Sequence, residues 1–198
     1  YFPIGHLDKA RVRELAAQAG LATQAKRDST GICFIGERPF KDFLKRFLPA
    51  QPGPLETPEG KYLGPHDGVM FYTLGQRQGL NIGGLAGSSG QPWYVVAKDI
   101  PNNRLIVAQG HDHPLLFSQI VSAIEVHWIS GNMPPIPYSC WAKTRYRQAD
   151  QPCVITQLEG EKCQVSFSQP QRAVTPGQSI VFYQGDECLG GAIIEASW

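Results

Sequence analysis

The sequence predicts a mainly β protein with some α, on three observations. The chain is rich in glycine and proline, with 21 Gly and 16 Pro in 198 residues. Such a composition favours short strands and turns over long helices. Apolar residues make up 42% of the chain, enough to form real cores. Over roughly the last eighty residues, short strand-like segments follow one another at close spacing.

Two segments near the beginning have helical periodicity. In residues 8–19 the apolar residues recur on one helix face, and Gly20 stands where a C-terminal cap belongs. In residues 39–48 Phe and Leu share one face, Lys and Arg line the other, and Pro49 ends the pattern. We therefore expect two short helices, separated by an aperiodic segment that contains Cys33.

The middle of the chain combines turns with extended pieces. Residues 51–68 are rich in Pro and Gly, and residues 69–74 are predicted to form a strand. The Gly-rich run 79–87 lacks the Lys-Ser/Thr ending of a phosphate loop, so we interpret it as a turn. A hairpin is predicted from residues 93–97 and 104–108. A domain boundary is expected within residues 110–116.

The last part of the chain predicts a small β-barrel that is closed or nearly closed. Turn signals such as Pro176-Gly177 separate the extended segments. None of these extended segments has a convincing helical period. The six predicted strands are 120–128, 139–147, 153–158, 163–167, 179–183 and 191–194.

Charge and cysteine usage exclude several classes of protein. The net charge is only +1, so a nucleic-acid surface would need local clustering of cations. No apolar run is long enough to cross a membrane, and a cytoplasmic protein is expected. The five cysteines are an odd number without a C-x-x-C pair, which disfavours a disulfide framework or a structural zinc site. The cluster at residues 111–113 (His-Asp-His) is interpreted as a surface turn, and no metal is expected.

Cys33 is the first candidate for chemistry. A thiolate can attack as a nucleophile or carry a transferable sulfur as a persulfide, and Lys26 and Arg27 would favour that form. However, Ile32 and Phe34 flank this cysteine, and a free Cys in an apolar setting is usually a small buried hydrophobe. Spacing alone leaves both interpretations open.

The segment 139–147 is the second candidate. With the period of a strand, one of its faces carries an aromatic and three cations, which are Trp141, Lys143, Arg145 and Arg147. The opposite face carries Cys140, Ala142, Thr144 and Tyr146. A cationic stripe beside an aromatic suits phosphates and stacked bases, and Arg172 and Gln178 add to it. The alternative is an ordinary solvated face of a barrel.

The stretch 28–37, Asp-Ser-Thr-Gly-Ile-Cys-Phe-Ile-Gly-Glu, strongly resembles the bacterial tRNA-specific 2-thiouridylase family. Further segments resemble the family in the same order across essentially the whole chain: 3–9, 71–80, 92–95, 143–147 and 175–178. The resemblance implies the end of an α/β catalytic domain with the Cys33 loop in residues 1–37. It also implies a small α+β central domain in residues 38–113 and a six-stranded, tRNA-docking β-barrel in residues 114–198.

The resemblance also implies a reaction. In this family ATP, with Mg, activates the C2 oxygen of the wobble uridine (U34) in the tRNAs for Lys, Glu and Gln. A sulfur-relay protein loads a persulfide onto the cysteine that matches Cys33. A second cysteine, which is absent from this chain, assists release of the sulfur and ends in a disulfide with the first. Covalent sulfur carriage divides a difficult substitution into feasible steps.

The chain departs from the family in lacking its Ser-Gly-Gly-x-Asp-Ser phosphate loop, its catalytic Asp and its partner cysteine. We therefore expect these 198 residues alone neither to bind ATP nor to thiolate tRNA. The resemblance implies tRNA contacts at Arg145, Tyr146 and Gln178, beside the strand candidates Lys143 and Arg147. Tyr146 lies on the inward face by alternation, so the strand must end before it or contain a bulge.

A rival interpretation comes from another class of protein. The chain would be a stand-alone RNA-binding β-barrel module, without thiol chemistry, in which Cys33 is merely structural. A translation-factor-like barrel is a third possibility, supported by fold analogy alone. The first two interpretations differ in what Cys33 does.

Overall fold

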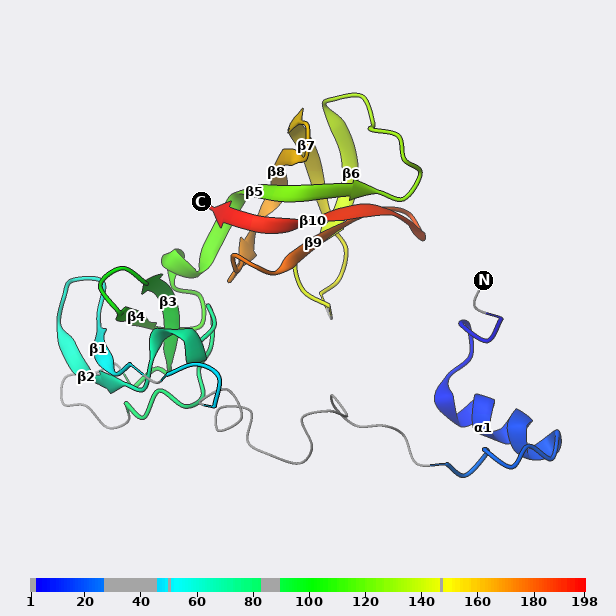
Figure 1. The fold of residues 1–198 in the computed structure, drawn as a ribbon, viewed down its shortest axis with the longest axis horizontal. Helices are drawn as coiled ribbons and strands as arrows, with labels where there is room; N and C mark the ends of the chain where they lie inside the picture. Colours follow the sequence, from blue (N-terminus) through cyan, green and yellow to red (C-terminus); the bar gives the residue numbers. More distant parts are fainter. Residues whose placement is uncertain (1–2, 27–45, 50, 83–89, 147) are drawn as a thin grey trace. The chain divides into compact units, whose positions relative to one another are not determined.

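The structure is a computed structural model that describes residues 3–26, 46–49, 51–82, 90–146 and 148–198. The chain divides into two compact units, Tyr1–Leu48 and Pro49–Trp198. Figure 1 shows helix α1 (Lys9–Gln18) in the first unit, and a small sheet and a barrel in the second. The helix predicted at residues 39–48 and the Gly-rich run 79–87 lie largely outside the described residues.

The first unit contains helix α1, Lys9–Gln18, as the periodicity predicted. Asp8 caps its N-terminus, because its carboxylate accepts a hydrogen bond of 2.8 Å from the backbone N–H of Arg11. Gly20 ends it with φ +68°, and the N–H groups of Gly20 and Leu21 donate to carbonyls of the last turn. No residue of α1 is buried, so the described part of this unit does not cover its apolar face.

The second unit begins with a four-stranded sheet of β1 (Gly53–Glu56), β2 (Tyr62–His66), β3 (Trp93–Asp99) and β4 (Arg104–Gln109). The strand order is β2-β1-β4-β3, and β1 and β4 are parallel whereas the other pairs are antiparallel. The hairpin predicted for residues 93–97 and 104–108 is therefore confirmed. Fully buried Leu and Val side chains from three of the strands form the core of the sheet: Leu55, Val95, Leu105 and Val107.

The strand predicted for residues 69–74 is wrong. Residues Val69–Phe71 form a short 3₁₀ turn, η1, and the chain then contacts β3 through a hydrogen bond of 2.8 Å from Gly75 N–H to the carbonyl of Val95. Val69 and Tyr72 are buried three residues apart, which is the period of a 3₁₀ turn rather than of a strand. The segment is a short, mostly apolar run, which is too short to distinguish the period of a strand from that of a 3₁₀ turn.

A second 3₁₀ turn, η2 (Pro114–Leu116), leads into a closed barrel of six antiparallel strands in the order β10-β5-β8-β7-β6-β9. The strands are β5 (Phe117–Trp128), β6 (Tyr138–Lys143), β7 (Gln151–Glu159), β8 (Lys162–Arg172), β9 (Ser179–Gln184) and β10 (Glu187–Ser197). The prediction of six strands and of a barrel is confirmed. Closure leaves this barrel without a free sheet edge, which removes the usual route to edge-to-edge aggregation.

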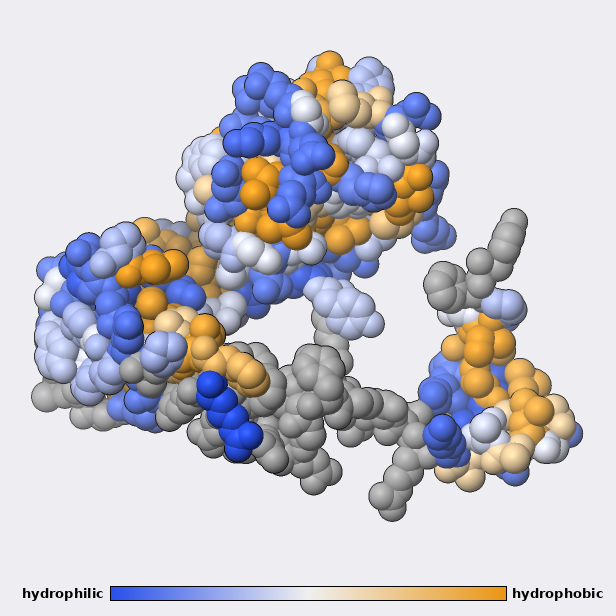
Figure 2. All heavy atoms as spheres, in the orientation of Figure 1, coloured by the Kyte–Doolittle hydropathy of each residue, from blue (hydrophilic) through white to orange (hydrophobic). Residues whose placement is uncertain are grey.

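Inward-facing residues fill the barrel. Phe167 and Phe182 are essentially inaccessible, and the ring of Phe182 stacks on that of Trp128 at 5.6 Å between centroids. Each such buried aromatic contributes about 1.5–3 kcal/mol relative to an exposed one. The face of the barrel seen in Figure 2 is mostly hydrophilic, with separate apolar patches, as expected when strand residues alternate between core and solvent.

Candidate nucleic-acid interface

The predicted strand 139–147 ends early, and this early end creates a loop. Strand β6 stops at Lys143. Thr144 is still buried, with 2% of its surface exposed, whereas Tyr146 is 94% exposed. Of the two explanations for Tyr146, an early end of the strand is therefore the correct one, and no bulge is needed.

A glutamine holds the loop in place. The Oε1 atom of Gln148 accepts hydrogen bonds from the backbone N–H of Thr144 at 2.9 Å and from its hydroxyl at 3.0 Å. The Nε2 atom of Gln148 donates at 2.6 Å to Oε1 of Gln171, which is itself buried on β8. Buried amides that are fully paired fix one geometry. The loop between β6 and β7 is therefore anchored to the wall of the barrel.

Arg145 points from this loop to two backbone carbonyls. Its Nη2 atom donates to the carbonyl of Leu74 at 3.0 Å and to that of Ala173 at 2.9 Å. Leu74 belongs to the segment after η1, so this side chain bridges the sheet domain and the barrel. Burial lowers the pKa of Arg145, and the nearby positive charge of Arg172 lowers it further.

Ala173, the acceptor in the barrel, has an unusual backbone. Its φ is +54°, a left-handed conformation that is uncommon for a residue with a Cβ atom. Its N–H donates at 2.6 Å to the carbonyl of Leu116, and its own carbonyl accepts from Arg145 and from the hydroxyl of Thr175. Such strain persists only where the surroundings over-determine it, and it is concentrated at functional sites.

Gln178 lies in the turn that follows. It is exposed, and its N–H donates to the carbonyl of Thr175 at 3.1 Å while its carbonyl accepts from Ile194 of β10 at 2.8 Å. Because Thr175 and Arg145 share the carbonyl of Ala173, the structure brings the Gln178 turn and the Arg145 loop to the same end of the barrel.

Lys143 differs from the other candidates because an acid compensates its charge. Its Nζ atom lies 3.2 Å from Asp150 and 5.1 Å from the centre of the Tyr183 ring. Trp141, which faces Tyr183 across the strand pair, is 41% exposed, so the predicted aromatic of the stripe is on the surface. Arg147, the last member of the predicted stripe, lies outside the described residues.

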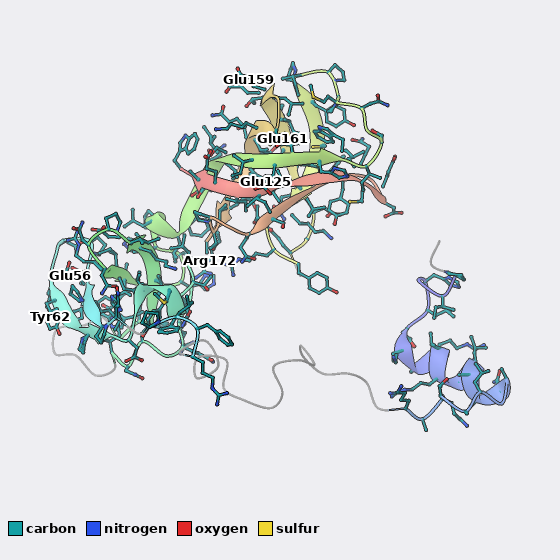
Figure 3. All side chains as sticks on the ribbon, viewed as in Figure 1. Glu56, Tyr62, Glu125, Glu159, Glu161 and Arg172 are labelled. Atoms are coloured by element: carbon teal, nitrogen blue, oxygen red, sulfur yellow. The ribbon has the colours of Figure 1, made fainter. Side chains whose placement is uncertain are left out.

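Arg172 and its contacts were only partly anticipated. The sequence indicated a surface cation, but its guanidinium lies over the ring of Tyr94 at 5.1 Å and its Nε atom donates to the carbonyl of His111 at 3.1 Å. Figure 3 places Arg172 where the barrel meets the sheet domain. No pattern in the sequence signalled the anchoring roles of Gln148 and Gln171, because both depend on contacts between distant strands.

Cys33 also lies outside the described residues. Of the other cysteines, Cys188 is exposed, whereas Cys140, Cys153 and Cys163 are buried in the barrel. The sulfur atoms of Cys140 and Cys153 are 3.7 Å apart. The hydrogen bond to Cys140 and then burial raise the pKa of Cys153, and burial raises the pKa of Cys163 to about 11. Neither of these two thiols is therefore a thiolate at neutral pH.

The remaining predicted features have structural roles. His111 pairs with the adjacent Asp112 at 2.6 Å, and Nδ1 of His113 accepts from Leu115 at the start of η2. Within the described ranges, no three His, Cys, Asp or Glu side chains are grouped closely enough to hold a metal ion. In the same ranges, no helix combines the length and the apolar character that spanning a bilayer requires.

Comparison with known proteins matches the chain in three consecutive parts. Residues 1–37 match a family described as tRNA methyl transferase HUP domain, and residues 41–109 match the tRNA methyl transferase PRC-barrel domain. Residues 118–194 match the Aminomethyltransferase beta-barrel domain. The fold class predicted from the sequence is thus confirmed as mainly β, with a short HUP-domain end, a PRC-barrel middle domain and a six-stranded barrel. The fold and the matches together define the C-terminal region of a tRNA-modifying type of protein.

Individual relatives show which type of tRNA-modifying protein the chain resembles. The tRNA-specific 2-thiouridylase MnmA of Coxiella burnetii (strain CbuK_Q154) is 60% identical over 193 residues, which are 98% of this chain and 52% of that protein. The proteins of the same name from Idiomarina loihiensis and Nitrosococcus oceani are 59% and 58% identical over 98% of this chain, and over 52% and 53% of their own lengths. The chain thus matches the C-terminal region of MnmA-like tRNA 2-thiouridylases over nearly its whole length. It spans about half the length of the curated relatives that it matches.

Proposed function

We propose that the gene product is a tRNA-uridine 2-sulfurtransferase that thiolates the wobble uridine (U34) of the tRNAs for Lys, Glu and Gln. The observation that carries the proposal is the similarity to 2-thiouridylases over 98% of the chain. Within such an enzyme, residues 1–37 would form the C-terminal end of the catalytic domain. Residues 38–113 would form the central domain, and residues 114–198 would form the tRNA-docking barrel. A cytoplasmic location follows from the substrate.

The barrel would dock the RNA. Supporting this role, the anchored loop exposes Tyr146, which follows Arg145 in sequence, and Arg145 reaches the end of the barrel that carries Gln178. Exposed aromatic rings stack on unpaired bases, and guanidinium groups bind phosphates. Lys143 and Arg147 would extend the cationic surface, although the ion pair with Asp150 neutralises part of the positive charge of Lys143.

Cys33 would carry the sulfur. A uracil oxygen is a poor leaving group, so ATP, as its magnesium complex, would first adenylate the C2 oxygen, and AMP would later depart with that oxygen. The outer sulfur of a Cys33 persulfide, supplied by a sulfur-relay donor protein, would form the new bond to C2. A second cysteine, not among these 198 residues, would reduce the persulfide bond and form a disulfide with Cys33. These residues contain no phosphate-loop motif, so alone they would not catalyse the reaction.

The decisive experiment replaces Cys33 by Ser in the complete gene product and measures 2-thiouridine in tRNA from cells that have no other copy. We expect the modified nucleoside to disappear while protein level and tRNA binding are retained. Cys188→Ser is the matched control, because Cys188 is an exposed cysteine of the barrel and should be dispensable. Normal thiolation with Cys33→Ser would instead support the rival function, an RNA-binding barrel module without thiol chemistry.

A further inference from the structure

A cavity lies at the end of the barrel opposite the loop that carries Tyr146. Because neighbouring strands are antiparallel, three connections share this end, which we call the far end (Figure 1). They are the β5–β6 loop (129–137), the β7–β8 turn (160–161) and the β9–β10 turn (185–186). The cavity, of about 400 Å³, is lined mostly by apolar side chains, which include Trp128, Ile129, Met133, Tyr138 and Leu189.

The β5–β6 loop that forms one wall of the cavity is held in place by the fold. The N–H group of Ile129 donates a hydrogen bond of 3.0 Å to the carbonyl of Leu189 on β10. Pro134 and Pro135, which also line the cavity, have φ angles fixed by their rings. A surface that is already formed loses little conformational entropy when a partner binds to it.

Apolar side chains of this loop are exposed to solvent. Ile129 is 63% exposed, and Met133 and Ile136 are exposed as well. Single apolar residues scattered over a surface are ordinary, but these three belong to one loop, and two of them line the same cavity. Apolar surface gathered around a recess is typical of a binding site.

The exposed charges at the far end are mostly negative. Carboxylates come from β5 and from the β7–β8 and β9–β10 hairpins: Glu125, Glu159, Glu161, Asp186 and Glu187. Glu187 lines the cavity itself, and the exposed basic residues nearby are Lys162 and His127. Within the described ranges, none of these carboxylates forms an ion pair. Figure 3 shows Glu159 at the end of the barrel away from Arg172.

This charge distribution selects the kind of molecule that fits. Carboxylates repel the phosphates of RNA, whereas the cations Arg145 and Arg172 lie at the opposite end, at the junction of the barrel with the sheet domain. A second copy of the chain in a symmetric contact would bring identical acids face to face. A segment with cations around an apolar side chain complements both the carboxylates and the cavity.

We propose that the far end of the barrel docks a partner protein, through a segment of the partner that presents an apolar side chain flanked by Lys or Arg. The apolar side chain enters the cavity between the β5–β6 loop and Leu189, and the flanking cations pair with Glu187 and its neighbouring acids. Because Tyr146 and Gln178 lie at the other end of the barrel, tRNA does not compete with this partner. The proposal does not rest on the proposed function, since a protein-docking surface requires no RNA at the opposite end.

The test uses three fluorescein-labelled peptides as probes and measures their binding to the complete gene product by anisotropy. The first peptide, Lys-Lys-Leu-Phe-Lys-Lys, has both features of the proposed segment. The second replaces Leu-Phe by Ser-Ser, and the third replaces every Lys by Glu. We expect only the first peptide to bind, with an affinity that falls as the salt concentration rises.

Variants at exposed positions locate the binding site without disturbing the fold. Ile129→Ser removes apolar surface from the cavity and should weaken binding of the first peptide on the order of tenfold. Ile100→Ser, at a position of the sheet domain with a similar exposure of 67%, is the matched control and should bind normally. Glu187→Gln should weaken binding and reduce its salt dependence, whereas Glu59→Gln in the β1–β2 turn should not. Thermal unfolding of each variant checks that the fold is retained.

The outcomes are distinct. Equal binding of the first peptide by Ile129→Ser and the wild type would exclude the cavity as the docking site. A second peptide that binds as tightly as the first would mean attraction by charge alone, against the proposal. Displacement of the first peptide by tRNA would assign the far end to RNA. A wild-type dimer in sedimentation that Ile129→Ser dissociates would assign it to a second copy of the chain. Normal peptide binding without any tRNA binding would overturn the proposed function and leave this surface standing.

Discussion

The side-chain oxygen of Gln148 accepts two hydrogen bonds from Thr144, one from its backbone N–H and one from its hydroxyl. This contact closes the loop directly after β6. The residue pair itself is largely shielded from solvent, whereas Tyr146, between them in sequence, is almost fully exposed. A rigid base and an exposed tip are what a recognition loop requires, since ordering the loop on binding would reduce affinity.

Replacement of Gln148 by Ala is expected to weaken both folding and RNA binding. The change leaves the N–H and hydroxyl of Thr144, and the side-chain oxygen of Gln171, without their Gln148 partner, at a cost of about 1–3 kcal/mol in the free energy of unfolding. Urea unfolding and tRNA anisotropy would measure the two effects. Gln157→Ala, at an exposed position of β7, is the matched control. Equal behaviour of the two variants would show that the glutamine contact does not hold the loop.

Tyr146 is expected to contribute to tRNA affinity but not to the free energy of unfolding. Its ring is 94% exposed, so Tyr146→Ala should change the free energy of unfolding by less than about 0.5 kcal/mol. Loss of a base stacked on the ring costs about 1–3 kcal/mol, which is roughly a 5- to 150-fold loss of tRNA affinity. Tyr146→Phe retains the stacking surface and should bind nearly as well as the wild type. If Ala and Phe bind equally, the ring does not stack on RNA.

The barrel cysteines should differ sharply in reactivity. In a Cys33→Ser background, N-ethylmaleimide at pH 8 should label Cys188 first, because Cys188 is exposed. Cys163 is buried with a pKa of about 11, so only about one in a thousand of its thiols would be ionised at that pH. Mass spectrometry of peptides after labelling, with and without denaturant, measures the order. Rapid native labelling of Cys163 would contradict the closed barrel.

The sheet domain should lose one stabilising contribution in acid. Hydrogen bonds from Asn102 and then from Arg104 lower the pKa of Asp99. A lowered folded-state pKa stabilises the fold above the unfolded pKa, near 4, and this contribution disappears as the pH falls through the folded value. The difference in unfolding free energy between the wild type and Asp99→Asn should therefore shrink between about pH 5 and pH 2. Asp186→Asn, in the exposed β9–β10 turn, is the matched control for removal of a surface carboxylate. A difference that is constant with pH would exclude the interaction.

Much of the fold could be predicted because its signals are local. Alternating residues in the barrel and the C-terminal cap at Gly20 are properties of short segments, and the structure places strands and the end of a helix there. The strand predicted for residues 69–74 failed because a short, mostly apolar run does not exclude a 3₁₀ turn.

The site was less predictable because its contacts join distant segments. Arg145 is 71 residues from Leu74 in sequence, and Arg172 is 61 residues from His111. Period-two counting placed Arg145 and Lys143 on one cationic face, but one binds backbone carbonyls and the other pairs with Asp150. Residue types indicated that cations were present, whereas only the tertiary fold determines which charges remain unpaired.

The close approach of Gly75 and Ala173 gives a test of the junction. Gly75 has φ +76°, and a Cβ atom at this position would lie 2.7 Å from the Cβ of Ala173. Gly75→Ala should therefore cost more in unfolding free energy than the about 1–2 kcal/mol of a left-handed conformation alone. It should also weaken tRNA binding, since the displaced segment carries the carbonyl of Leu74 that orients Arg145.

Gly160→Ala isolates the contribution of the backbone conformation to this cost. Gly160 has φ +58°, and a Cβ atom there would have no described atom within 4 Å, so its substitution meets the conformational penalty without a steric clash. The difference in unfolding free energy between the two variants, measured with urea, then reports the clash with Ala173. If the two variants are equally stable and Gly75→Ala binds tRNA normally, the sheet domain and the barrel do not pack closely at Gly75, and Arg145 would not depend on Leu74 for its orientation.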